Sequence, residues 1–337
     1  MVAVWVGAVM RVGPAAYPRP GMPGPRVLID CDPGHDDAIA ILLAAVHAEI
    51  VGITTVSGNA SLSDTTRNAL VVTQLVGLDV PVHAGASRPL LAPARYAPQV
   101  HGETGLDGPI LPALVRTPAS ADALGFLLET TRREEGLWLV ATGPLTNVAL
   151  AMRADAHFAD RLAGITVMGG SAAAGNVTPV AEFNTWCDPE AAAIVYSAPC
   201  PVWMSGLDLT HQVLVRPPLV ERIRDVGSTI GTFVADLFDF YLDGYAATHF
   251  DERAAPLHDP CALLALTHPA LFGRSAVPIA VETSGRLTRG MTVVDRRRGA
   301  SGLEDAPTAP ERTTSWVHSA DADAIFDLLV DAIGTFS

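Results

Sequence analysis

Short apolar segments recur along the chain, and each is followed by a polar turn and a stretch of helical periodicity. Five of these segments are nearly continuous runs of apolar residues, at 27–29, 51–56, 137–141, 165–168 and 202–204. Strands that are apolar on both sides must be covered on both sides, which is typical of parallel sheets flanked by helices. We therefore predict an α/β fold with a Rossmann-like, open, mainly parallel twisted sheet that carries helices on both faces.

The length of the chain, 337 residues with 49% hydrophobic content, allows one large core. No internal repeat or long linker divides residues 26–337, so we expect them to form a single domain. The first 25 residues contain an apolar patch before Arg11 and then a Pro/Gly-rich stretch, without the basic start of a signal peptide. We expect residues 1–25 to be a disordered extension or the product of a misassigned start, with Met22 as the alternative initiator, rather than an export signal.

Charge and cysteine usage exclude several classes of partner. The formal net charge of -14 would repel a phosphate backbone, so we expect no nucleic-acid partner. No segment has the ~18 uncharged apolar residues that a membrane span needs. The four cysteines are scattered without zinc-site spacing. We interpret them as reduced thiols and expect the protein to be cytoplasmic.

A cluster of carboxylates follows the first strand. The stretch VLIDCDPGHDDAIA, residues 27–40, places Asp30, Asp32, Asp36 and Asp37 between a strand and a helix. One of the four can cap the helix, which is worth ~1 kcal/mol. Carboxylates about 4 Å apart repel each other by about 4 kcal/mol at an effective dielectric constant of ~20, so a cation is expected among the others. Oxygen ligands alone favour Ca²⁺ or Mg²⁺, and a phosphatase-like DxD site is the alternative.

The same stretch, DCDPGHDDA, resembles the N-terminal signature of the nucleoside hydrolases, the inosine-uridine preferring N-ribohydrolases. Further segments match that family in the same order: VSGN (56–59), HGETGLDGP (101–109), ATGPLTNVAL (141–150), AEFN (181–184), DPEAA (188–192), GLDLTH (206–211), PLHDPCAL (256–263) and GMTVVD (290–295). The resemblance covers about residue 26 to the C-terminus. It implies the nucleoside hydrolase fold and hydrolysis of the N-glycosidic bond of ribonucleosides to ribose and free base.

The resemblance also implies a Ca²⁺ ion that chelates the 2′- and 3′-hydroxyls of ribose. The matching ligands are the carboxylates of Asp32, Asp37 and Asp259 and the backbone carbonyl of Thr142. By similarity, Asp32 is also the general base for the attacking water, and Asp36 holds the 2′-hydroxyl. Asp259 would contact the substrate as well as the ion. Three carboxylates and a carbonyl form a suitable set of hard ligands for calcium.

Three polar residues, Asn176, Glu182 and Asn184, follow the predicted strand at 165–168. The residues alone favour ordinary turn chemistry for this group. Their place after a strand and the AEFN match imply instead that they bind the 3′- and 5′-hydroxyls of ribose, with Asn59 contributing after its own strand. Amides suit neutral hydroxyls because each offers both a donor and an acceptor.

His258 stands next to Asp259, and by similarity it faces the nucleobase as the leaving-group acid. A lone histidine is more often structural, but few other side chains deliver a proton near pH 7. We expect His101 to line the same pocket. Met168 is expected to pack under the sugar, although a methionine at a strand end is more often part of the core.

Two other functions stay open at this point. A metal-dependent phosphohydrolase with Asp32 as nucleophile lacks positive residues near the cluster, and a catalytically silent nucleoside-binding protein would keep the same pocket. The sequence does not decide between purine and pyrimidine salvage, and Tyr245, His249 and Phe250 are candidate base contacts only. Because relatives form homodimers or homotetramers, we expect a homo-oligomer here too.

Overall fold

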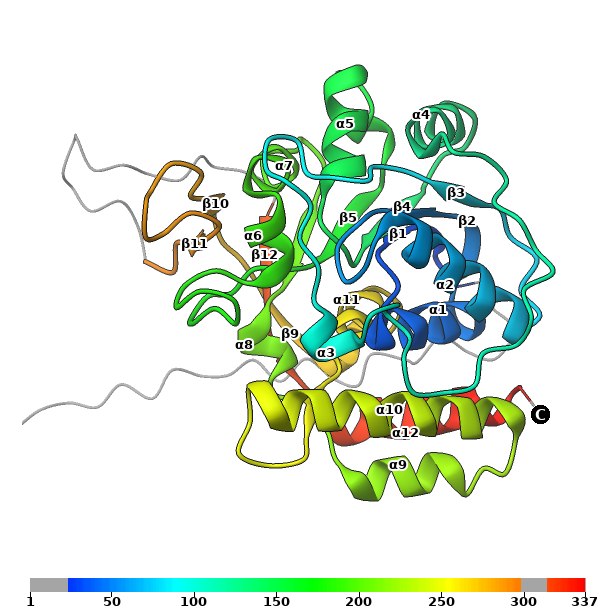
Figure 1. Cartoon of the computed structure of the whole chain (residues 1–337). Helices are drawn as coiled ribbons and strands as arrows, with labels where there is room; N and C mark the ends of the chain where they lie inside the picture. Colours follow the sequence, from blue (N-terminus) through cyan, green and yellow to red (C-terminus); the bar gives the residue numbers. More distant parts are fainter. Residues whose placement is uncertain (1–23, 298–313, 337) are drawn as a thin grey trace, which may run out of the picture.

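Strands from both ends of the chain share one central sheet (Figure 1). The computed structural model describes residues 24–297 and 314–336. The strand order is β3-β2-β1-β4-β5-β6-β12-β9, and every neighbouring pair is parallel except β12 and β9. The strand bounds are β1 Arg26–Cys31, β2 Glu49–Thr55, β3 Val82–Ala84, β4 Trp138–Ala141, β5 Gly164–Met168, β6 Val202–Ser205, β9 Phe272–Ala276 and β12 Thr314–Ala320. The predicted mainly parallel α/β sheet is confirmed.

All five predicted strands are present, as β1, β2, β4, β5 and β6. The prediction missed the two edge strands, β3 and β9, and also β12. β3 has only three residues, and β12 reads TSWVHSA, with three of its seven residues Ser or Thr. These strands lack the continuous apolar run of a strand that is buried on both faces. Two small antiparallel pairs, β7–β8 (Leu214–Val215 with Ala255–Pro256) and β10–β11 (Ile279–Val281 with Thr292–Val294), were also missed.

Helices cover both faces of the sheet (Figure 1). Side chains of β1 alternate between two cores: Val27 and Ile29 belong to one, and Leu28 belongs to the other. The first core is formed with α1 (His35–His47), α2 (Leu62–Leu75), α9 (Pro217–Arg224), α10 (Thr229–Thr248), α11 (His258–Thr267) and α12 (Ala322–Gly334). The second core is formed with α4 (Ala123–Arg133), α5 (Thr146–Ala154) and α7 (Pro189–Val195).

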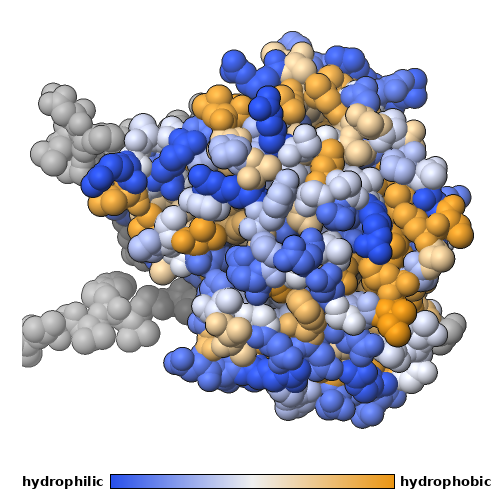
Figure 2. Space-filling view, viewed as in Figure 1, coloured by the Kyte–Doolittle hydropathy of each residue, from blue (hydrophilic) through white to orange (hydrophobic). Residues whose placement is uncertain are grey.

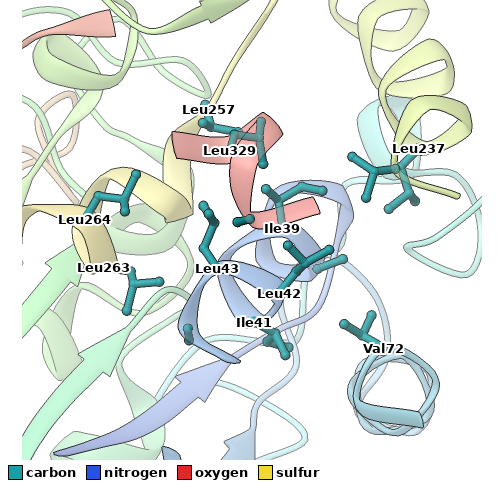
Figure 3. Packing of buried hydrophobic residues seen from close by; sticks show 14 of the residues in the cluster. Ile39, Ile41, Leu42, Leu43, Val72, Leu237, Leu257, Leu263, Leu264 and Leu329 are labelled. Carbon is teal, nitrogen blue, oxygen red and sulfur yellow. The ribbon is translucent and has the colours of Figure 1, made fainter. Parts of the chain in front are cut away.

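Helix α1 is buried on all sides over most of its length, as expected for a helix that is apolar all round. Figure 3 shows Leu263 and Leu264 of α11, Leu329 of α12 and Leu237 of α10 around it. Such dense packing fixes a helix in place. The polar residues in the first turn of α1 therefore have a rigid support.

The surface over α9 and α10 is mainly hydrophilic (Figure 2). Arg224 of α9 pairs with Asp236 and Asp239 of α10 at 3.0 and 2.7 Å. No helix in the described ranges is both long and apolar enough to cross a membrane. The expectation for residues 1–25 lies almost entirely outside the described residues, and the single domain over 26–337 stays a prediction.

Candidate active site

Polar residues gather at the carboxyl ends of β1 and β4, where the strand order reverses. From β1 the chain moves to β2 and β3 on one side, and β4, β5 and β6 continue on the other side. Asp30 lies opposite Ala141 in this parallel pair, and the Thr142 N–H donates to the Asp30 carbonyl at 2.9 Å. Open α/β sheets bind their ligands in the crevice at such a reversal.

Three carboxylates meet at this crevice. Asp36 and Asp37 lie in the first turn of α1, and Asp259 lies in the first turn of α11. One oxygen of each carboxylate lies within 4.8 Å of the other two, and all three residues are buried. The positive ends of the two helices offset only part of this charge. The donor set is hard oxygen throughout, so it suits a divalent cation such as Ca²⁺ or Mg²⁺.

Asp32 lies beside this group with one oxygen free. Its Oδ2 accepts the Asn59 N–H at 2.7 Å, whereas its Oδ1 is buried and contacts no donor among the described residues. Two glycines let the backbone approach: a Cβ on Gly58 would lie 2.0 Å from Oδ2, and one on Gly143 would lie 2.5 Å from Oδ1. A buried oxygen without a donor is costly unless it binds a ligand. This oxygen therefore also fits an ion or a water in the crevice.

Burial and mutual repulsion dominate the electrostatics of the cluster. Burial, and then the charge of Asp37, raises the pKa of Asp32 well above its ordinary value. Burial, followed by the charges of Asp36 and Asp37, does the same to the pKa of Asp259. The pKa of Asp36 is raised to about 7 by burial and then by the charge of Asp37. A bound cation would favour the charged carboxylates and reverse these shifts.

Asp37 provides the helix cap that the sequence assigned to one of the four carboxylates. Its Oδ2 accepts the Gly34 N–H at 3.0 Å and the Asn59 side-chain amide at 3.1 Å. Its Oδ1 accepts the Thr142 hydroxyl at 2.7 Å, and the Thr142 carbonyl accepts the Asn184 side-chain amide at 2.7 Å. A carboxylate has about four acceptor sites and a carbonyl has two, so both groups can still coordinate an ion.

The structure brings only some of the predicted metal ligands together in this group of three carboxylates. Asp37 and Asp259 belong to the group of three carboxylates, but its third member is Asp36, which the sequence analysis assigned to a sugar hydroxyl. Asp32 and Thr142 lie next to the group. The choice of ligands among these residues stays a prediction.

The long loop after β5 returns at α6 (Phe183–Cys187), and Glu182 caps that helix. The Glu182 carboxylate accepts the N–H groups of Gly170, Asn184 and Thr185 at 2.8, 2.9 and 3.2 Å. Burial raises the pKa of Glu182, and these hydrogen bonds oppose the rise. The turn chemistry that the residues alone suggest is thus present. Glu182 nevertheless also lines the cavity described below.

Asn176 and Asn184 combine structural hydrogen bonds with exposure to the same cavity. Asn176 Oδ1 accepts the Phe183 N–H at 3.0 Å. The Asn184 amide donates to the carbonyl of Met168 at 3.2 Å as well as to Thr142. Met168 packs into a small apolar cluster and also lines the cavity, so both of its predicted roles have support. Each asparagine retains donor or acceptor capacity for a ligand.

His258 is held by two hydroxyls. Its Nδ1 hydrogen-bonds the Thr210 hydroxyl and its Nε2 the Tyr245 hydroxyl, both at 2.7 Å. Burial, followed by the neighbouring His211 and His249, lowers the pKa of His258 well below its ordinary value. A neutral imidazole carries one N–H, so one hydroxyl accepts from the ring and the other donates to it. Tyr245, which the sequence analysis named only as a candidate base contact, therefore hydrogen-bonds His258, the predicted leaving-group acid.

His101 ends the short helix α3 (Pro98–His101) and faces another histidine. Its Nδ1 lies 3.2 Å from Nδ1 of His35, whose Nε2 hydrogen-bonds the Asp107 carbonyl at 2.9 Å. Burial is the main cause that lowers the pKa of both rings, to about 4 for His35. The predicted place of His101 beside the pocket is consistent with this arrangement.

A cavity of about 300 Å³ connects these groups. It is lined by Asp36, Asn59, Ala97, Gln99, Val100, His101, Thr142, Met168, Asn176, Val177, Glu182, Phe183, Asn184, Tyr241, Tyr245, His249, His258 and Asp259. This lining, drawn from the described residues, contains no lysine or arginine. Apart from the candidate base contact Phe250, every predicted substrate-contacting residue is on it, and Asp32 and Asp37 lie buried beside it.

The sequence analysis did not assign Tyr241 or Gln99 to the pocket. Tyr241 and Tyr245 are four residues apart on α10, so they share one face of the helix. That spacing indicates the shared face but not which cavity the face borders. Phe250 does not line the cavity and packs against the Tyr245 ring, with centroids 5.7 Å apart.

Curated sequences that are similar over most of this chain are named as ribonucleoside hydrolases. A pyrimidine-specific ribonucleoside hydrolase, RihA, of a Shewanella species (strain MR-7) is 41% identical over 315 residues, which cover 92% of this chain and 96% of the relative. The RihA of Escherichia coli O1:K1 is 44% identical over 273 residues, which cover 80% and 88%.

Solved structures agree in fold. A purine-preferring ribonucleoside hydrolase from Gardnerella vaginalis superposes with a TM-score of 0.84 at 30% identity, covering 92% of this chain and 98% of that one. A plant nucleoside hydrolase, PpNRh1, gives 0.85 at 30% identity, covering 93% and 99%. The sequence profile of the inosine-uridine preferring nucleoside hydrolases matches residues 27–327. The chain therefore belongs to this family of ribonucleoside-hydrolysing enzymes.

Proposed function

We propose that the chain is a calcium-dependent hydrolase of the N-glycosidic bond of ribonucleosides, with a preference for pyrimidine ribonucleosides. The observation that carries this proposal is the group of buried carboxylates of Asp36, Asp37 and Asp259 at a cavity whose described lining has no basic side chain of the lysine or arginine type. Such a pocket repels a phosphate and suits a neutral polyol held by a cation. The products are ribose and a free base, as salvage of nucleosides requires.

The carboxylates of Asp32, Asp37 and Asp259 and the carbonyl of Thr142 would hold the calcium ion. When bound, the ion supplies a chelate for the ribose diol and lowers the pKa of a nearby water. Asp32 accepts the proton of the attacking water, and its Oδ1, which lacks a donor in the described residues, supports this role. Asp36 accepts a hydrogen bond from the 2′-hydroxyl of the ribose. Dependence on this hydroxyl predicts slow hydrolysis of 2′-deoxynucleosides.

The amide groups orient the sugar. Asn59, Asn176 and Asn184 line the cavity with Glu182, and they present donors and acceptors to the 3′- and 5′-hydroxyls. Asn176 and Asn184 are also bonded to the backbone of α6 and β5, so they are already positioned before a substrate binds. Such preorganisation reduces the entropy that the reaction must lose.

His258 and Tyr245 assist the departure of the base. His258 is neutral in the free pocket because burial lowers its pKa, and its Nε2 is bonded to the Tyr245 hydroxyl. For His258 to act as the leaving-group acid, the ring first takes up a proton from solvent; it then donates that proton to the Tyr245 hydroxyl as this hydroxyl gives its own proton to the base, which leaves the ring neutral again. A positioned acid of this kind contributes about 10²- to 10⁴-fold to the rate.

The preference for pyrimidines rests on the relatives. Those at 41–44% identity are named pyrimidine-specific, whereas the structures named purine-preferring or inosine-guanosine hydrolases are 27–30% identical. The higher identity supports a pyrimidine pocket here.

The test is an activity panel of uridine, cytidine, inosine, adenosine and guanosine, each with and without a calcium chelator. We expect reducing sugar to appear fastest from uridine and cytidine, no phosphate, and no activity with the chelator. Tight binding without turnover, or faster release from purine nucleosides, would contradict the proposal.

The cytoplasmic location and the oligomeric state are part of the proposal. All four cysteines are free and buried, which supports a reducing compartment. A homodimer or homotetramer is expected by similarity to the family, and the mass in solution, by light scattering, distinguishes the two.

A further inference from the structure

One wall of the cavity follows a segment without regular structure. Residues 85–97 connect β3 to α3, and this described range contains neither a helix nor a strand. The residues at and directly after its end, Ala97, Gln99, Val100 and His101, line the cavity. The position of this segment therefore determines where that wall lies.

Hydrogen bonds hold this segment at Leu90 and at Ala97, but not between these two residues. The Leu90 N–H donates to the Asp188 carboxylate at 2.8 Å, and the Ala97 N–H donates to the Asn59 carbonyl at 3.1 Å. Residues 91–96 make no hydrogen bond to any other described residue. Two of them are largely open to solvent, since Leu91 is 75% and Tyr96 46% exposed.

A single aromatic contact holds the middle of the segment. The guanidinium carbon of Arg95 lies 3.7 Å from the ring centroid of Trp186, well within the range of a cation–π interaction. Arg95 comes two residues before Ala97, and Trp186 comes two residues after Asn184, on α6. Both neighbours line the cavity, so the contact joins two of its walls from behind.

We propose that Arg95 and Trp186 are positioning residues whose contact fastens residues 91–96 to α6 and so sets the distance between these two walls. The inference rests on the proposed function in one respect, because it takes the cavity to be the nucleoside site. Neither side chain lines the cavity itself. Their effect is therefore on the binding of the substrate rather than on the chemical step.

The chain contains a matched contact that serves as a control. Arg274 lies over the Trp203 ring, also at 3.7 Å from the centroid. This pair joins β9 to β6, and neither of its residues lines the cavity. If such contacts only stabilise the fold, the two pairs should respond alike to substitution.

The kinetic test compares Trp186→Leu and Arg95→Gln with Trp203→Leu. In the first two variants we expect KM for uridine to rise by about 3- to 10-fold, with kcat within about twofold of wild type. The reason is that a displaced cavity wall weakens the binding of the substrate but does not change the residues of the chemical step. Arg95→Lys keeps a cation over the ring and should restore most of the loss. Trp203→Leu should leave KM unchanged even where it lowers the melting temperature.

Hydrogen exchange gives a readout that does not depend on activity. Exchange of the hydrogen-bonded amides of Ala97, Val100 and His101 should become about tenfold faster in Trp186→Leu and Arg95→Gln, but not in Trp203→Leu, because a local anchor is lost. The double variant should match either single variant, as expected for residues in direct contact. Arg95→Gln changes a half-exposed loop residue, so this arm remains informative if Trp186→Leu does not fold.

Unchanged KM and unchanged exchange in folded Arg95→Gln would overturn the inference, as would an equal rise of KM in Trp203→Leu. A wild-type protein that hydrolyses no ribonucleoside would instead overturn the proposed function, while the exchange experiment would still decide whether the contact fastens the segment.

Discussion

The proposed sugar half and the proposed base half of the cavity are built on different parts of the molecule. The sugar half comes from the ends of the central strands β1 and β4 and from the buried helix α1, which carries Asp36 and Asp37. The base half comes from the end of α10, with Tyr245, and from His249 just beyond it. The first set lies at the ends of the central strands, whereas the second lies on a helix outside the sheet, although Tyr245 packs into the same core as β1 and α1.

The relatives differ in the base preference for which they are named. Proteins named for pyrimidine specificity and for purine preference share the fold of this chain. We therefore expect the family to keep one sugar site and to change its base preference through residues outside the central strands. The comparison predicts that damage to the sugar half stops hydrolysis of every riboside, and that damage to the base half depends on the leaving group.

The largest effect is expected for Asp32→Asn. An amide cannot accept the proton of water and is a poorer cation ligand, so turnover of uridine and of p-nitrophenyl riboside should both fall by several orders of magnitude. Steady-state kinetics on the two substrates, with bound calcium measured in parallel, tests this.

Asp30→Asn is the control for that substitution. Asp30 is also fully buried and, like Asp32, has one oxygen without a donor among the described residues, but it lies within β1 and is not among the residues assigned to the ion or the substrate; its Oδ1 accepts the Asn147 side-chain amide at 2.8 Å. This variant should lose stability and keep most of its turnover. Strong residual activity in Asp32→Asn with calcium still bound would place the general base elsewhere.

A smaller and selective effect is expected for His258→Ala. Hydrolysis of uridine should slow by about 10²- to 10⁴-fold, because the leaving base loses its proton source. p-Nitrophenolate leaves without protonation, so p-nitrophenyl riboside should be affected little. Rates for both substrates under the same conditions give the comparison.

Tyr245→Phe removes only the hydroxyl that bonds His258, and it should show the same selectivity if the proton passes through that group. If both substrates slow equally in either variant, the affected residue supports the pocket, for example through Asp259, and the acid lies elsewhere.

The sequence predicted the two halves of the site unequally, for a physical reason. Asp32, Asp36 and Asp37 stand between an apolar strand and a helix, a local pattern that by itself indicates a position at a strand end. Tyr241 and Gln99 reach the cavity only through the packing of α10 and α3, which are distant from that strand end in sequence. Local patterns do not determine such contacts.

The same reason explains the missed strands. The strand β1 is identified by its own residues, but β12 and β9 depend on pairing with β6 and with each other. The anchor between Arg95 and Trp186 also joins residues far apart in sequence. What depends on local composition could be predicted, and what depends on long-range pairing could not.

The smallest effect concerns stability without the metal. Burial is the main cause that raises the pKa of Asp36 to about 7 and that of Asp30 to about 6, compared with about 3.9 in an unfolded chain. The folded state then binds protons that the unfolded state has released. This stabilisation is fully present below about pH 4 and is lost as the pH rises through 7.

For these groups alone, the chelator-treated protein should therefore melt at a lower temperature at pH 8 than at pH 5, by an amount on the order of 5 °C. Calcium should raise the melting temperature most at pH 8, because it binds the ionised carboxylates of the native state. Differential scanning calorimetry at both pH values measures this. A higher melting temperature at pH 8 than at pH 5 in metal-free protein would show that burial does not raise the pKa values of these carboxylates as described.

The central claim, that a cation among Asp37, Asp259 and their neighbours serves the sugar half for every substrate, is tested most directly by metal removal. Uridine and p-nitrophenyl riboside are assayed before exhaustive chelation and dialysis, after it, and after addition of calcium. We predict that both activities fall to background and that calcium restores both. Unchanged hydrolysis of either riboside by protein shown to be free of metal would contradict the claim.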